Sequence, residues 1–188
     1  MTPFTRLALA ATLALSPFAA TAQNDTAAQN ETTTAEKSVD IANNTAFGDW
    51  IVNCEAITAK RTSCRLVQEQ TLRKTGELVA RFIALPVIDG AILLAQVPMD
   101  VYLPGGAVYR FGGNEEVEQR EMIWQRYAKD VCEAAAPLDE AELAIFAKED
   151  TMLFGFRPNA DAEPVVLSVD ISQFAEALKA LRAADAEG

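Results

Sequence analysis

Short apolar runs follow one another along the chain from Phe47 onward, separated by turn-forming residues at intervals of about ten residues. This spacing is typical of an antiparallel β-sandwich or barrel, in which each strand ends at a tight connection. In the first run, Trp50, Val52 and Cys54 occupy alternate positions, so they share one face of a predicted strand. Further strands are predicted over residues 64–70, 78–85, 92–97, 108–111, 152–156 and 164–169.

Two segments depart from this alternation and predict short helices. Residues 138–147 follow Pro137 and carry acidic side chains in their first turn, which suits the positive end of a helix. Near the C-terminus, Ser172 can cap a helix over residues 173–182, whose apolar residues recur on one face. Both apolar faces are expected to pack onto the sheet.

The two ends of the chain lack the pattern of a folded domain. Residues 1–22 combine one basic residue, an apolar run and a small-x-small cleavage site, which predicts a secretory signal removed before Gln23. The run is too short to cross about 30 Å of hydrocarbon, so no transmembrane segment is expected. Residues 23–45 have almost no large apolar side chain and predict a disordered polar linker. We therefore expect a single domain, a mainly β, antiparallel two-layer β-sandwich with two short helices over residues 46–183, then a flexible tail at 184–188. The location should be periplasmic, secreted or cell-surface.

The composition excludes several classes of function. The formal net charge of −11 disfavours binding to nucleic acid. The chain contains no histidine, so Ser-His-Asp triads, Cys-His pairs and imidazole-zinc sites cannot be built from it. No motif predicts a cofactor or a resident metal.

Three cysteines in an exported chain allow one disulfide and leave one thiol over. Cys54 and Cys64 lie on adjacent predicted strands joined by the polar turn 58–62, so they can face each other across a hairpin. Closing this loop would stabilise the fold by about 2 to 3 kcal/mol, chiefly by restricting the unfolded chain. Pairing of either residue with Cys132 is the alternative. An unpaired Cys132 would be buried as a small apolar group or would bridge two copies in a homodimer.

A locally basic stretch stands out on this acidic chain and is the first candidate for partner binding. Its members are Lys60, Arg61, Arg65, Arg73 and Lys74. As a docking face, it would bind an anionic surface such as lipopolysaccharide or a sulfated glycan. The alternative is that these side chains protect edge strands from pairing with other sheets.

Two other classes of function have candidate residues. Trp124, in a polar setting, could stack on sugars in a glycan-binding sandwich, although aromatic side chains equally fill sandwich cores. The acidic residues Glu115, Glu116, Glu118 and Glu121 could supply a pair of carboxylates to a hydrolase, with or without calcium. A solvated loop or strand edge explains the same acidic run without any chemistry.

Several motifs, in order, resemble the invasion-associated locus B family of exported bacterial proteins. They are Phe47-Gly48-Asp49-Trp50, Val52-x-Cys54-Glu55, Cys64-x-x-x-Gln68, Val97-Pro98-x-x-Val101-x-Leu103-Pro104-x-Gly106, Cys132-x-Ala134 and Leu167-Ser168…Phe174…Ala177-Leu178. The family commonly has two cysteines close together where this chain has only Cys132.

The resemblance implies one β-rich, sandwich-like domain in the periplasm or at the cell surface, in a family linked to host-cell invasion. It supplies no catalytic residue. The function expected from it is that of a non-enzymatic protein that binds an envelope or host partner, either a protein or an anionic glycan or lipopolysaccharide.

Overall fold

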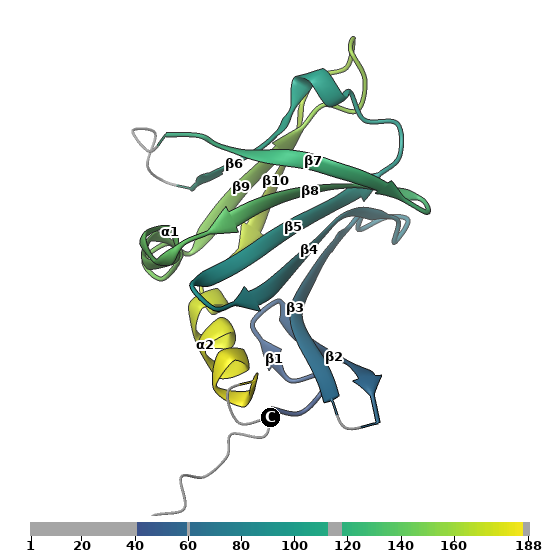
Figure 1. Ribbon diagram of the computed structural model, residues 1–188. Coiled ribbons are helices and arrows are strands. Elements are labelled where there is room, and N and C mark those ends of the chain that lie inside the picture. Colours follow the sequence, from purple (N-terminus) through teal and green to yellow (C-terminus); the bar gives the residue numbers. More distant parts are fainter. Residues whose placement is uncertain (1–40, 60, 113–117, 186–188) are drawn as a thin grey trace, which may run out of the picture. The chain divides into compact units, whose positions relative to one another are not determined.

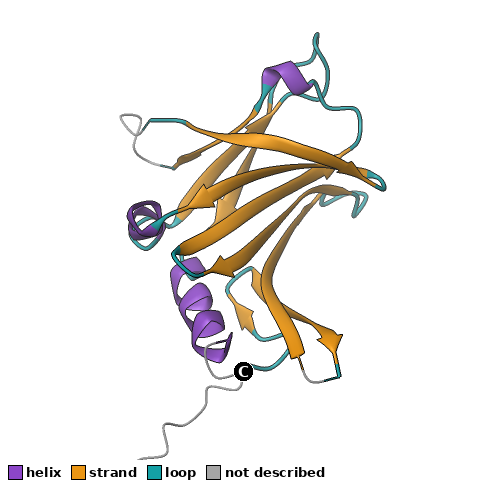
Figure 2. Cartoon of the chain, in the orientation of Figure 1, coloured by secondary structure: helices purple, strands orange, loops and turns teal. Residues whose placement is uncertain are grey.

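The computed structural model describes residues 41–59, 61–112 and 118–185. Within these ranges the chain forms ten strands, two α-helices and one 3₁₀ turn (Figures 1 and 2). The strands are β1 (Ala46–Phe47), β2 (Trp50–Thr58), β3 (Arg61–Thr71), β4 (Leu78–Val87), β5 (Gly90–Pro98), β6 (Ala107–Phe111), β7 (Arg120–Ala128), β8 (Val131–Leu138), β9 (Thr151–Phe156) and β10 (Val165–Asp170). The helices are α1 (Glu140–Phe146) and α2 (Phe174–Asp185), and the 3₁₀ turn spans Leu103–Gly105. The expected signal and most of the expected linker lie outside the described residues.

These strands form one antiparallel sheet in the order β1-β2-β3-β4-β5-β8-β7-β6-β9-β10. Strand β7 connects the part of the sheet from β1 to β8 with the part from β6 to β10. Its residues 120–122 pair with β6, whereas the rest of the strand pairs with β8. Figure 1 shows β9 and β10 crossing behind β5 and β8. Phe82 of β4 meets Phe154 of β9 edge to face, with ring centres 5.1 Å apart. The predicted mainly β, antiparallel fold with two short helices is confirmed, and a single continuous sheet supplies both layers.

Aromatic rings connect the helices to the core. Phe111 of β6 contacts Phe146 of α1 at 5.1 Å between ring centres, and Phe146 contacts Phe174 of α2 at 4.9 Å. Phe174 in turn packs edge to face on Trp50 of β2, also at 4.9 Å. Edge-to-face pairs at this separation are favourable beyond the area they bury. Trp50 and Val52, which the alternation places on one face of the strand, are both buried in the core.

Strands β7 and β8 were not among the strands predicted from sequence, and the predicted helix over 138–147 begins too early. Leu138 is the last residue of β8, where it pairs with Ala91 and is buried. Asp139 instead caps α1, because its carboxylate accepts the Glu142 N–H at 2.8 Å. Gly90, the first residue of β5, packs against the end of β8 and has a φ of 153°. A Cβ at this position would collide with the Leu138 carbonyl oxygen. The close approach of β5 to β8 therefore requires glycine.

Both ends of the hydrogen-bonded domain extend beyond the predicted bounds. Asn44 donates to the Val52 carbonyl at 2.8 Å, and Val52 donates to the Thr45 carbonyl at 2.9 Å, although both partners belong to the expected linker. At the other end, α2 continues to Asp185, inside the expected tail. The predicted helix cap, Ser172, donates its hydroxyl to the Asp170 carboxylate at 2.7 Å.

Candidate functional site

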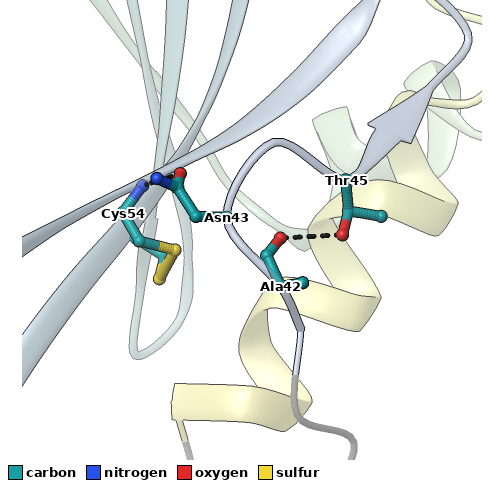
Figure 3. Close-up of a disulfide and its surroundings, with 5 residues drawn as sticks. Ala42, Asn43, Thr45 and Cys54 are labelled. Atoms are coloured by element: carbon teal, nitrogen blue, oxygen red, sulfur yellow. Dashed lines mark hydrogen bonds between the residues drawn. A yellow bond between two sulfur atoms is a disulfide. The ribbon is translucent and has the colours of Figure 1, made fainter.

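The β2–β3 hairpin is held by a disulfide. Cys54 and Cys64 are opposite each other in the strand register, their Cα atoms are 4.0 Å apart, and their sulfur atoms are bonded (Figure 3). The predicted pairing is confirmed. Cys132 is free and buried, which excludes the alternative pairings and places its thiol away from solvent. Burial raises the pKa of the Cys132 thiol.

Beyond the disulfide, the hairpin has no core beneath it. The exposed residues are Glu55, Ala56, Ile57, Thr58, Ala59, Arg61, Thr62 and Ser63. Strand β3 begins to pair with β4 only at Leu66, so this end of the hairpin consists of β2 and β3 alone (Figure 1). Ile57 keeps 49% of its surface accessible. A two-stranded ribbon without an apolar face is marginally stable by itself, so the disulfide is the main restraint on its conformation.

A short segment before β1 completes the base of the hairpin. The Asn43 side-chain oxygen accepts the Cys54 N–H at 2.9 Å, next to the sulfur bond (Figure 3). With the Asn44 and Thr45 bonds to Val52, this segment covers the outer edge of β2 up to the disulfide. No hydrophobic period in the sequence indicates this contact, because it depends on one amide side chain and two backbone groups.

The structure separates the basic residues that the sequence grouped together. Arg61 is exposed at the hairpin tip, whereas Arg73 and Lys74 are exposed in the turn between β3 and β4. The strand between them rises about 3.3 Å per residue, which puts the two groups roughly 35 Å apart. Arg65 lies beside Glu55, with a nitrogen–oxygen distance of 3.7 Å. Lys60 lies outside the described residues. These side chains therefore do not form one continuous basic face.

Trp124 does not present an open ring face. It is half-buried and packs against the core, on the inner side of β7 opposite Ala134. Its indole nitrogen is buried and has no hydrogen-bond partner within the described ranges. A shift in the strand register follows directly, between Trp124 and Arg126. The arrangement favours a packing role over sugar stacking.

The acidic residues at positions 115–121 do not form a site among the described residues. Glu118 and Glu121 are exposed, and Glu115 and Glu116 lie outside the described residues. No group of three or more side chains able to hold a metal ion is found in the part of the chain that the structure describes.

Two other carboxylates, those of Glu133 and Glu142, are largely buried, and each forms an ion pair with an arginine. Glu133 is 4% exposed and accepts bonds from Arg126 at 3.0 Å and from Gln96 at 2.8 Å. Glu142 accepts the Tyr109 hydroxyl at 2.8 Å and lies 3.2 Å from the Arg120 guanidinium.

These contacts have a structural role. Gln96, which donates to Glu133, also accepts a hydrogen bond from Arg81, and Arg81 donates to Glu69. The contacts of Glu133 are thus part of a chain of polar side chains across the outer face of the sheet. Around Glu142, burial and the adjacent carboxylate raise the pKa of Tyr109 above its ordinary range. The two ion pairs link β7 to α1 through Arg120 and Glu142, and β7 to β8 through Arg126 and Glu133.

The sequence profile described as "Invasion associated locus B (IalB) protein" matches residues 50–182. This chain belongs to the invasion-associated locus B family. The match begins at Trp50 and includes the disulfide hairpin, β7, β8 and most of α2. The resemblance inferred from the motifs is therefore confirmed.

A crystal structure from the same family has the same fold. Invasion associated protein B from Bartonella henselae superposes with a TM-score of 0.65 at 17% sequence identity, covering 77% of this chain and 97% of that one. No curated protein matches the sequence. In the described residues, no helix is long and apolar enough to span a bilayer.

Proposed function

We propose that this member of the invasion-associated locus B family is exported and acts by binding rather than by catalysis. Its contact element is the disulfide-held end of the β2–β3 hairpin, residues 55–63. Its partner is an anionic surface of the envelope or host, such as lipopolysaccharide or a sulfated glycan. The family name links its members to invasion, and the disulfide suits an oxidising compartment such as the periplasm or cell surface.

One observation supports the choice of the hairpin. The eight described residues beyond the disulfide are all exposed, yet a covalent bond fixes the strands at their base. The disulfide therefore holds in one conformation an element whose side chains contribute little to the core. A rigid element is useful for recognition, because fewer conformations are lost when a partner binds.

The charge at this end suits an anionic partner. Arg65 is balanced by Glu55 in the structure. Lys60 and Arg61 contribute two further positive charges on a chain of net charge −11. The exposed side chain of Ile57 adds an apolar surface at the same end of the hairpin as Arg61.

Retention on immobilised lipopolysaccharide and on heparin, over a range of salt concentrations, tests this function. The double variant Lys60→Gln/Arg61→Gln should elute earlier than the unmodified protein, with the largest difference at low salt because screening weakens exposed charges. The matched control is Arg73→Gln/Lys74→Gln, which removes the same charge at the other end of β3. Equal effects of the two variants would show that overall charge, and not the hairpin, controls retention. No retention of the unmodified protein would contradict the anionic partner.

A further inference from the structure

The last strand of the sheet, β10, has an open side. A backbone bond of 2.9 Å joins the Ile171 N–H to the Asp150 carbonyl, continuing the β9–β10 ladder. Hydrogen-bonding groups alternate sides along a strand, so the odd-numbered residues of β10 face β9. The backbone groups of the even-numbered residues, Val166 and Ser168 among them, point to the opposite side.

A contact at the end of β10 confirms this alternation. The Asp170 carbonyl, which is even-numbered, accepts the Trp50 indole N–H at 3.0 Å from outside the β9–β10 pair. Across the described part of the molecule, the outward N–H and C=O groups of Val166 and Ser168 have no such partner. Two donors and two acceptors are thus available along the middle of β10.

Strand β10 also lacks the features that prevent sheets from pairing edge to edge. Natural edges are blocked by lysine, proline, bulges or covering segments. Residues 165–169 contain no charged residue and no proline, their register with β9 is regular, and Val166 is 62% exposed. The opposite edge differs, because Asn43, Asn44 and Thr45 cover β2. One edge of the sheet is protected and the other is open.

We propose that β10 pairs with β10 of a second copy of this chain, antiparallel about a two-fold axis at Leu167. In this register Val166 of each copy lies opposite Ser168 of the other, so the two donors and two acceptors of one strand meet those of its partner. Four backbone hydrogen bonds form. Shifting the register to centre on Ser168 would use Asp170, whose carbonyl Trp50 already occupies.

The flanking residues favour a second copy over an unrelated strand. With the axis at Leu167, Asp170 lies opposite Pro164 and Glu163 lies opposite Ile171, so no acidic residue faces another. The pairing is isologous, because the same residues contribute on both sides. It therefore closes at two copies and leaves both β10 edges covered. The buried thiol of Cys132 takes no part, so the association is non-covalent.

The charge of the chain sets how this dimer responds to salt. Each copy carries a net charge of −11, so the copies repel one another at low ionic strength. Salt screens this repulsion and should strengthen the dimer. Binding of an anionic partner through the hairpin should weaken with salt, which separates the two interactions experimentally.

Sedimentation equilibrium of the purified protein, from micromolar to millimolar concentration at low and high salt, tests the proposal. We expect a monomer–dimer equilibrium that Val166→Lys weakens by at least about tenfold. Ser168→Pro should do the same, since the N–H it removes faces the open side and makes no bond inside the sheet. The matched control is Ile123→Lys, which places the same charge at a site of similar exposure, 65%, on the interior strand β7. It should leave the equilibrium unchanged.

Three results would overturn the proposal. The first is an unmodified protein that stays monomeric at every concentration. The second is a dimer that survives Val166→Lys with its dissociation constant unchanged. The third is equal weakening by Ile123→Lys, which would indicate general apolar association. Thermal unfolding of each variant shows whether it is folded, and Val166→Lys decides the question if Ser168→Pro is not.

Discussion

Replacing Trp50 with phenylalanine should lower the free energy of unfolding by about 2 to 3 kcal/mol. Trp50 is 1% exposed, contacts Phe174, and donates its indole N–H to the Asp170 carbonyl at 3.0 Å. Phenylalanine keeps a ring against Phe174 but removes that hydrogen bond, which contributes about 1 kcal/mol net. The smaller ring also leaves a gap, which accounts for a further 1 to 2 kcal/mol or so. Trp50→Ala should cost roughly 3 to 5 kcal/mol.

The second tryptophan provides a matched control. Trp124→Phe makes the same chemical change at a ring whose buried indole nitrogen has no partner among the described residues. Removing an unpaired donor relieves a desolvation cost, so this variant should change the unfolding free energy by less than about 1 kcal/mol, in either direction. Urea denaturation followed by far-ultraviolet circular dichroism measures both without relying on tryptophan fluorescence. Equal losses for the two variants, or an unaffected Trp50→Phe, would refute the role given to the Asp170 contact.

Three further outcomes follow from the same structure. Replacing Cys54 and Cys64 together with serine should lower the unfolding free energy by about 2 to 3 kcal/mol, measured by urea denaturation without reductant; an unchanged midpoint would mean that the hairpin is held by other contacts. Burial and Glu142 raise the folded-state pKa of Tyr109, so the stability tied to its neutral form is present below pH about 10 and is lost as the pH rises further. Tyr109→Phe should therefore flatten the alkaline fall in melting temperature, and an equally steep fall would contradict this. Cys132 should react with a thiol reagent only after denaturation, and rapid labelling of the native protein would show that it is accessible.

Local patterns predicted the parts of the fold that depend on neighbouring residues. Alternation placed Trp50 and Val52 on one buried face, and spacing across a polar turn placed Cys54 opposite Cys64. Both features need only the strand period and a short connection.

Strands β7 and β8 could not be read in the same way. Residues 133–136 read Glu-Ala-Ala-Ala, a sequence with weak strand preference, and they form a strand because β5 and β7 pair with both of its sides. Strand β7 also lacks a clear alternation of buried and exposed positions, because Met122 is its one fully buried residue. Tertiary pairing decided the structure of both segments.

The candidate site was predicted in part. The hairpin and its disulfide were predicted correctly from the sequence, whereas Arg61 was grouped with Arg73 and Lys74 only because these residues are near one another in the chain. A strand converts ten residues into roughly 33 Å, whereas a helix of the same length spans only about 15 Å. The open edge of β10 could not be predicted from the sequence, because it depends on the order of the strands in the sheet.

The most direct test of the account is the dissociation constant for lipopolysaccharide, measured by titration at several salt concentrations for three proteins. These are the unmodified protein, Lys60→Gln/Arg61→Gln and Arg73→Gln/Lys74→Gln. If the hairpin end is the contact element, the first double variant should bind at least about tenfold more weakly at low salt and depend less on salt, while the second matches the unmodified protein. Identical affinities and salt dependence for all three proteins would contradict a docking role for the hairpin.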